Sequence, residues 1–199
     1  MTPFLLGIGG GTASGKSTVA DAVASALGSR CLHIHHDRYY HSLPVELRHQ
    51  PLEYNFDHPD ALETERLVGD LATLRAGRAA ALPVYDFASH ARSDTTERVS
   101  PHPVILVEGI LVLSDPRLRS LLDRAVFVHA PSDVRLARRI RRDMAMRGRD
   151  AESVLTQYER TVRPMHLQYV EASQQYADVV LDGTSRLDGL VAQVLELLP

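Results

Sequence analysis

Short apolar runs alternate along the chain with longer segments whose apolar residues have helical spacing. The runs predict buried strands at 4–8, 31–35, 103–107, 125–129 and 178–181. The longer segments predict helices at 16–27, 60–75, 116–122, 132–146, 151–169 and 186–198. Strands and helices in this order predict an α/β fold, a mostly parallel sheet with helices on both faces that binds ligands at the carboxyl ends of its strands.

One segment interrupts the alternation. Residues 82–100 contain Pro83, Tyr85, Phe87 and Thr95-Thr96, and we expect them to form an inserted hairpin. Insertions beside a ligand site often carry substrate recognition. We treat residues 1–199 as a single domain, because 199 residues with 44% hydrophobic content can form one full core and no linker divides them.

The turn between the first strand and the first helix matches the phosphate-binding pattern G-x-x-x-x-G-K-[ST] in full. Its residues are Gly10, Gly11, Thr12, Ala13, Ser14, Gly15, Lys16 and Ser17, followed by Thr18. Backbone amides of such a loop and the helix N-terminus cradle phosphates, and the Ser17 hydroxyl can bind Mg²⁺. Lys16 is the only lysine among 22 basic residues. A compact ammonium fits inside this loop, whereas a guanidinium is too wide.

Two acidic residues follow apolar strands. Glu108 ends the third strand and Asp37 follows the second. At such positions one carboxylate can hold Mg²⁺ opposite Ser17, and another can accept a proton from a hydroxyl nucleophile. We therefore expect both carboxylates near the γ-phosphate of a bound nucleotide.

Seven arginines lie between 135 and 149, and no acid lies between 134 and 142. Arg135, Arg138, Arg139 and Arg142 share one helical face, so we expect several guanidiniums to converge on one target. This predicts a helical, arginine-rich lid over about 132–150 that supplies positive charge to transferred phosphates. Gly148 would let the tip bend.

Charge and hydropathy narrow the function class. The net charge of −3 argues against general nucleic-acid binding. No apolar stretch approaches 18 residues and the N-terminus lacks the features of a signal peptide, so we expect a cytoplasmic protein without membrane contact. The lone Cys31 suits core packing. His33, His35 and His36 lack Cys or acidic partners at a metal-ligand spacing, so we expect no zinc site.

Three classes of nucleotide-binding protein compete. A GTPase of the usual kind needs an N-K-x-D element. This chain cannot contain one, because its only lysine, Lys16, belongs to the phosphate-binding loop. A mechanochemical or nucleic-acid ATPase remains possible, although the chain is short, acidic, and has its arginines concentrated in one segment. A small-molecule kinase accounts for the phosphate-binding loop, the strand-end acids and the lid together.

Further motifs resemble those of the uridine kinase (uridine-cytidine kinase) family. They occur in family order over about residues 4–181: Tyr54–Ala61, Pro83–Phe87 through His90 and Arg92, Val107–Leu111, Arg138–Asp150, and Gln157-Tyr158 through Asp178. The resemblance implies a P-loop NTPase-type fold and transfer of the γ-phosphoryl group of ATP, with Mg²⁺, to the 5′-hydroxyl of uridine or cytidine. A pyrimidine nucleoside and ATP would be the small-molecule partners, in pyrimidine salvage, and the resemblance suggests a homotetramer.

The resemblance also implies roles for individual residues. Asp37 would take the hydroxyl proton and, with Ser17 and Glu108, organise Mg²⁺, while Asp57 would bind the ribose hydroxyls. Tyr85 and His90 match positions that contact the pyrimidine, with Phe56 packed nearby, and Gln157 matches a residue facing the nucleoside. The lid arginines would be Arg139, Arg142, Arg147 and Arg149. Arg142 would bind ATP, and it would also take part in catalysis together with Asp37 and Lys16.

Some features depart from the family pattern. The stretch between Tyr40 and Tyr54 is compact and contains two prolines, and Leu181-Asp182-Gly183-Thr184 replaces the usual basic continuation after Asp178. The second departure puts adenine-side or subunit contacts in question. The alternative reading within the fold is a kinase for another hydroxyl acceptor, such as phosphoribulose or pantothenate, although His90 and the Tyr-Asp-Phe hairpin favour a nucleoside.

Overall fold

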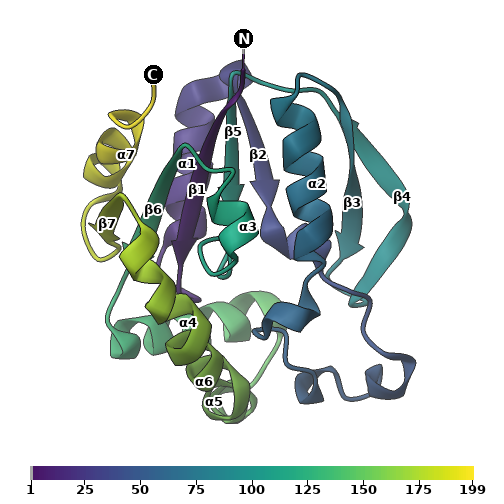
Figure 1. Cartoon of the computed structure of the whole chain (residues 1–199). Coiled ribbons are helices and arrows are strands. Elements are labelled where there is room, and N and C mark those ends of the chain that lie inside the picture. Colours follow the sequence, from purple (N-terminus) through teal and green to yellow (C-terminus); the bar gives the residue numbers. More distant parts are fainter. Residues whose placement is uncertain (1) are drawn as a thin grey trace.

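The computed structural model describes residues 2–199. Within them, five parallel strands form the central sheet in the order β2-β5-β1-β6-β7 (Figure 1). Their bounds are β1 Phe4–Gly10, β2 Cys31–His35, β5 Val104–Glu108, β6 Arg124–His129 and β7 Val179–Asp182. The predicted α/β class with a parallel sheet is confirmed.

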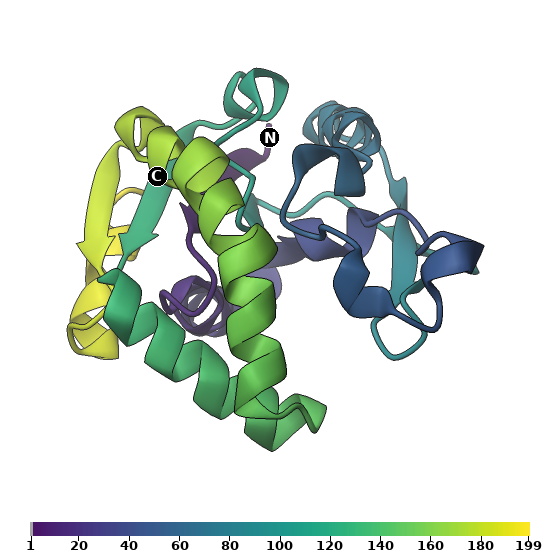
Figure 2. The ribbon, with the colours of Figure 1, turned by 90° about the horizontal axis from the view of Figure 1, so that it is seen from below.

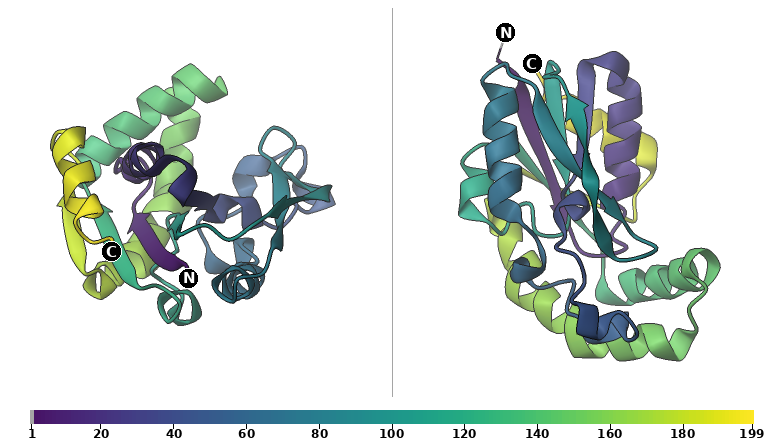
Figure 3. Two further views of the ribbon diagram at one scale, coloured as in Figure 1. Left: turned by 90° about the horizontal axis from the view of Figure 1, so that it is seen from above. Right: turned by 90° about the vertical axis from the view of Figure 1, so that its right-hand side faces the viewer.

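Helices cover both faces of this sheet (Figure 3). The cluster on one face joins β1, β5 and β6 to α1 and α7, and the cluster on the other joins the sheet to α2, α3 and the hairpin. The helical bounds are α1 Lys16–Leu27, α2 Thr64–Arg75, α3 Pro116–Arg119, α4 Ser132–Arg147, α5 Ala151–Gln157, α6 Arg163–Met165 and α7 Leu187–Leu195. None of these helices is both long and apolar enough to cross a bilayer.

The helices predicted at 116–122 and 186–198 are shorter in the structure, and two others differ in kind. The helix expected over 60–75 starts at Thr64, because Pro59–Ala61 forms a separate 3₁₀ turn. The helix expected over 151–169 leaves regular α geometry after Gln157 and widens into π turns at Tyr158–Val162 and His166–Val170. Pro164 explains the irregularity, since its ring lacks an amide hydrogen and clashes with the carbonyl four residues earlier.

The segment that interrupts the alternation is a two-stranded antiparallel hairpin outside the main sheet, formed by β3 (Ala80–Asp86) and β4 (Ala91–Val99). It lies beyond α2, at the right of Figure 1. Seen from below, α4 and the helical stretch 151–176 form two arms on one side, and residues 40–60 with the hairpin lie on the other (Figure 2). The carboxyl ends of the strands point between these two sides.

Candidate active site

The phosphate-binding loop (residues 10–17) joins β1 to α1 and has a backbone that few residues can adopt. Gly10 has φ of 144° and Gly15 has φ of 102°. A Cβ on Gly10 would lie 2.4 Å from the carbonyl oxygen of Val128, so glycine is required there on two grounds. The first turn of α1 has neither an acidic residue nor a side-chain cap. Its free amides and dipole are therefore available to an anion.

Oxygen ligands meet where β5 ends beside α1. The Ser17 hydroxyl lies 3.2 and 3.4 Å from the two carboxylate oxygens of Glu108, which is buried. His35 pairs with Glu108 in the parallel β2–β5 register, and its Nδ1 lies 2.9 Å from Glu108 Oε1. Burial alone would raise the pKa of Glu108, but the hydrogen bond from His35 and the charge of Lys16 lower it to about 2. Glu108 is thus ionised throughout the physiological range.

Asp37 lies just past β2, in the 3₁₀ turn His36–Tyr39. Burial and the neighbouring charge of Glu108 raise its pKa to about 6, against a smaller opposite effect of Lys16. Because β2 and β5 are adjacent in the sheet, their ends bring the two carboxylates together, as expected from the sequence. The result is one permanently ionised carboxylate beside one that titrates near neutrality.

Asp57 is a third carboxylate in the same electrostatic neighbourhood. Burial raises its pKa, while the charges of Arg139, Lys16 and Arg142 act in the opposite direction. Its amide donates to Asn55 Oδ1 at 3.2 Å, which shapes the turn that carries it. Asp57 therefore comes from the 40–60 side of the molecule to face lysine and arginine side chains of the loop and the lid.

Aromatic rings line the side formed by residues 40–60 and the hairpin. The ring of Phe56 lies 5.6 Å from Tyr40 and 5.2 Å from His90, and Tyr40 lies 5.6 Å from Tyr85, all between centroids. We call Tyr40, Tyr54, Phe56, Tyr85 and His90 the aromatic cluster. His90, at the hairpin turn, has a positive φ of 51°. Burial and the charge of Arg147 lower the pKa of His90, so its imidazole is neutral at physiological pH.

The arginines of the lid (residues 132–150) do not share a single target. Arg135 donates to the Ala130 carbonyl, and Arg138 donates to the Gly183 carbonyl at 3.0 Å. The expectation that Arg135, Arg138, Arg139 and Arg142 converge is therefore wrong for the first two. The reason is that a backbone carbonyl accepts from each of these two guanidiniums, which a helical face alone does not reveal.

Four of the other five lid arginines surround Asp143, whose side chain is fully buried. Its carboxylate oxygens lie within 4 Å of guanidinium nitrogens of Arg139, Arg142, Arg147 and Arg149, the shortest distance being 2.9 Å to Arg142 Nε. One carboxylate thus holds four cations at the lid tip. Sequence reasoning missed this role, although an acid directly after an acid-free arginine run was a usable signal.

Gln157 connects α5 to the lid and the loop. Its Oε1 accepts from Arg139 at 2.9 Å and from Arg149 at 2.7 Å. Arg139 also donates to the Thr12 hydroxyl at 3.1 Å. The predicted residues Gln157, Arg139, Arg149 and Thr12 therefore form one continuous network that ties the lid to the phosphate-binding loop.

A cavity of about 370 Å³ opens beside the phosphate-binding loop. Its walls include Lys16, Thr18, Arg138 and Arg142, together with Gly183 and Ser185 of the β7–α7 connection and Leu187 and Leu190 of α7. A Cβ on Gly183 would lie 2.1 Å from the Ser14 carbonyl oxygen, so only glycine allows this connection to pack on the loop. This is the segment whose departure from the family pattern put adenine-side contacts in question, and in the structure it forms one wall of the cavity beside the loop.

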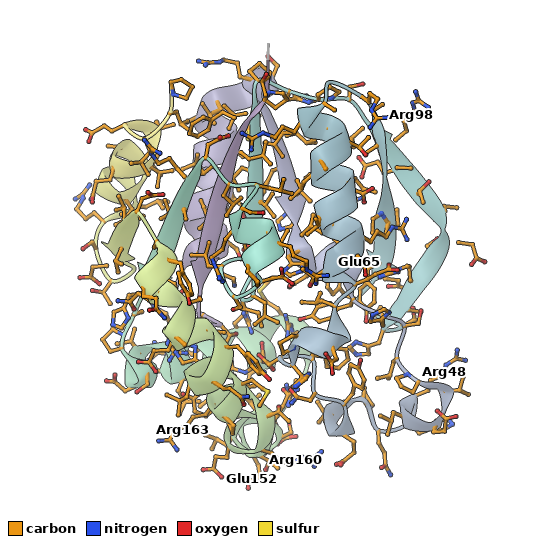
Figure 4. All side chains as sticks on the ribbon, in the orientation of Figure 1. Arg48, Glu65, Arg98, Glu152, Arg160 and Arg163 are labelled. Carbon is orange, nitrogen blue, oxygen red and sulfur yellow. The ribbon has the colours of Figure 1, made fainter. Side chains whose placement is uncertain are left out.

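Charged side chains at the outer end of the helical stretch 151–176 are exposed. Figure 4 shows Glu152, Arg160 and Arg163 at the lower end of the molecule, away from the sheet. Arg160 pairs with Glu53 at 2.6 Å, so an ion pair bridges the helical stretch 151–176 and the 40–60 side. Both partners are exposed, and such a pair adds little to stability.

Comparison with known proteins agrees with this geometry. The model of the phosphoribulokinase / uridine kinase family matches residues 5–188. The chain is 49% identical to a uridine kinase of Chloroflexus aggregans over 96% of this chain and 94% of that protein. It is 44% identical to a uridine kinase of Clostridium botulinum over 98% of both chains. The solved structure of a possible uridine kinase from Bacillus stearothermophilus has the same fold, with a TM-score of 0.67 and 19% identity over 92% of this chain and 90% of that one.

Proposed function

The chain belongs to the phosphoribulokinase / uridine kinase family, and from this membership we propose that it transfers the γ-phosphoryl group of ATP to the 5′-hydroxyl of uridine, cytidine or both. The products are UMP and CMP. The observation that supports the proposal is that the charges of Asp37 and Asp57 act both on Lys16 of the phosphate-binding loop and on Tyr40 of the aromatic cluster. A phosphate donor and a flat, hydroxyl-bearing acceptor can meet there.

Asp37 is the general base in this proposal. A base is most effective when its pKa lies close to the working pH, and the pKa of Asp37 is raised to about 6 by burial and by Glu108. Its ionised carboxylate accepts the proton of the 5′-hydroxyl as that oxygen attacks phosphorus. Glu108 cannot take this role, because a carboxyl with a pKa of about 2 is too weak a base.

Ser17, Glu108 and Asp37 have the donor set that Mg²⁺ prefers, one hydroxyl and two carboxylates. The 3.2 Å approach of Ser17 Oγ to Glu108 brings two of these donors within the span of one cation. When bound, Mg²⁺ neutralises phosphate charge during transfer. The hydrogen bond from His35 fixes the orientation of the Glu108 carboxylate. Lys16 is near enough for its charge to lower the pKa of Glu108, and its ammonium binds the phosphates.

Substrate selection is assigned to Asp57 and the aromatic cluster. Asp57 accepts hydrogen bonds from the ribose hydroxyls, and a deoxyribose would leave a buried carboxylate without a partner. The neutral imidazole of His90 can donate to a pyrimidine carbonyl or accept from an exocyclic amine, which serves both uracil and cytosine. Tyr85 and Phe56 supply the apolar walls for the ring.

The lid supplies positive charge over the transferred group. Arg142 lines the cavity beside Lys16 and contacts ATP, and Arg139, Arg147 and Arg149 serve the phosphates and the nucleoside side. Their common partner Asp143 keeps the guanidiniums close together without a ligand, which would otherwise be opposed by repulsion between cations. We further propose that the enzyme acts in pyrimidine salvage in the cytoplasm and as a homo-oligomer, a tetramer by family resemblance. Sedimentation analysis tests the last point.

A kinase assay across a panel of acceptors tests the proposed function. Purified protein with ATP and Mg²⁺ should phosphorylate uridine or cytidine with a kcat/KM far above those for 2′-deoxyuridine, adenosine, ribulose 5-phosphate and pantothenate. A preference for either of the last two acceptors would replace the nucleoside assignment with another kinase of the fold. Omission of Mg²⁺ should remove the activity.

A further inference from the structure

A second group of metal-ligand side chains lies one layer below Ser17 and Glu108. Asp21 follows Ser17 by four residues on α1, so it sits on the same helical face one turn farther along. His33 precedes His35 by two residues on β2, so both rings project from the same face of the sheet. α1 packs beside β2, and Asp21 lies at the same height along the sheet as the two histidines.

The three side chains are close enough to share one ion. Ligand atoms of Asp21, His33 and His35 all lie within 4.8 Å of one another. His33 Nδ1 lies 3.5 Å from Asp21 Oδ1, and the two imidazole centroids are 4.2 Å apart. Ligands about 2.0–2.2 Å from a tetrahedral zinc ion are separated from one another by roughly 3.5 Å. Small side-chain rotations would therefore complete the site.

The position of the cluster in the fold favours access by an ion. β2 is an edge strand of the described sheet, so α1 covers only one side of the histidines. The side chain of Asp21 is 66% exposed and that of His35 is 43% exposed, whereas that of His33 is 14% exposed. Two histidines and one carboxylate facing solvent on one side match a zinc site that keeps water as a fourth ligand.

His35 connects this cluster to the catalytic centre. Its Nδ1 is hydrogen-bonded to Glu108, which leaves Nε2 as the nitrogen for a metal ion. A histidine that ligates a metal through one nitrogen and donates from the other to a carboxylate is a recurrent arrangement. Here the carboxylate is the one assigned to Mg²⁺. A cation on His35 would hold Glu108 more strongly and add positive charge beside the Mg²⁺ position.

We propose that Asp21, His33 and His35 bind a transition-metal ion such as Zn²⁺, and that its binding lowers the affinity of the catalytic centre for Mg²⁺. The ligand types suit Zn²⁺ and its spectroscopic substitute Co²⁺ better than Mg²⁺, because imidazole favours borderline metals. The inhibitory part rests on the proposed function, whereas the binding part does not.

Titration of the full-length protein with Co²⁺, without nucleotide or Mg²⁺, tests the binding part. Visible absorption should report one bound Co²⁺ per chain, and Zn²⁺ should displace it. Asp21→Asn and His33→Gln should each weaken Co²⁺ binding at least about tenfold. Asp21 is exposed, so its variant should fold even if the His33 variant does not.

Matched controls separate this site from its alternatives. His49→Gln removes an exposed histidine elsewhere and should leave the Co²⁺ affinity unchanged. Cys31→Ser should also leave it unchanged, although Cys31 lies on the same face of β2. Co²⁺ binding that survives Asp21→Asn and His33→Gln, or that instead requires Asp37 or Cys31, would overturn the proposal.

Kinase assays then test the coupling. Zn²⁺ should raise the Mg²⁺ concentration for half-maximal activity of the wild type, and it should have little such effect on Asp21→Asn. An equal effect of Zn²⁺ on both proteins would overturn the inhibitory part. If the protein phosphorylates no nucleoside, the proposed function fails, and the Co²⁺ titration still decides whether the site exists.

Discussion

Replacement of Asp37 by asparagine should slow phosphoryl transfer and stabilise the folded protein at the same time. The substitution keeps the size of the side chain but removes the proton acceptor and one negative charge. Loss of a general base lowers the rate at saturating substrate by at least about a hundredfold. Nucleoside affinity should change much less, because other residues are assigned to the sugar and the base.

The expected stabilisation follows from the raised pKa. Between its ordinary value of 3.8 and about 6, the folded protein retains a proton on Asp37 that the unfolded chain has released. The ionised group therefore destabilises the fold increasingly as the pH rises through this window, and by a constant amount above it. Since one pKa unit corresponds to about 1.4 kcal/mol, the full effect is up to roughly 3 kcal/mol. Asparagine does not ionise, so the variant does not undergo this destabilisation.

Urea unfolding of the wild type and Asp37→Asn at pH 4 and pH 8, without Mg²⁺, measures this difference. The variant should have nearly the same free energy of unfolding as the wild type at pH 4 and a higher one at pH 8. Saturating Mg²⁺ and ATP should reduce the gap, because ligands that bind only the folded state stabilise the wild type. Asp94→Asn, which removes an exposed carboxylate in β4, is the control and should show no such pH dependence.

Two outcomes would refute the reasoning. Equal free energies of unfolding for the wild type and Asp37→Asn at pH 8 would mean that the carboxylate is not destabilised by burial and Glu108. A collapse of nucleoside binding with a normal rate at saturation would make Asp37 a binding residue, and the base would have to be sought elsewhere.

Four further predictions concern other parts of the site. Lys16→Arg should nearly abolish turnover without changing the circular dichroism spectrum, because only an ammonium fits the loop, and normal turnover would contradict the assignment of the loop. His90→Ala should lower kcat/KM for uridine and cytidine by an amount equivalent to roughly 1 to 3 kcal/mol and leave ATP affinity unchanged. Asp57→Ala should erase discrimination against 2′-deoxyuridine. Normal kinetics in both variants would contradict the assignment of a nucleoside substrate. Asp143→Asn should lower the free energy of unfolding by roughly 3 kcal/mol, the scale for breaking a buried ion pair, and raise the KM for ATP, while the exposed Asp133→Asn on the same helix should do neither. The kcat/KM of the wild type should rise with pH through about 6, following ionisation of Asp37, and a flat profile between pH 5 and 7 would exclude it as the base.

Local patterns in the sequence were enough to predict the phosphate-binding loop and the fold class, and the fold class is confirmed. Apolar runs and helical spacing predicted all five strands of the sheet to within a few residues, because burial between two helical layers leaves a continuous apolar signature. The phosphate-binding loop is likewise contiguous, so its glycines and Lys16 are visible as a motif. The proximity of Glu108 to Asp37 was also predicted from the order of strands and helices, because the carboxyl ends of parallel strands lie at one edge of the sheet.

Contacts between segments distant in the chain were decided only by the tertiary structure. Asp21 and His33 come from different elements, and nothing in their separation of twelve residues indicates that α1 packs beside β2 at that level. Helical periodicity predicted a shared face for the arginines, but their actual partners depend on which buried carbonyls and carboxylates lie opposite each one. The pKa of Asp37 depends on burial and on a charge 71 positions away in Glu108. Such quantities are set by through-space distance and desolvation, which a linear pattern does not contain.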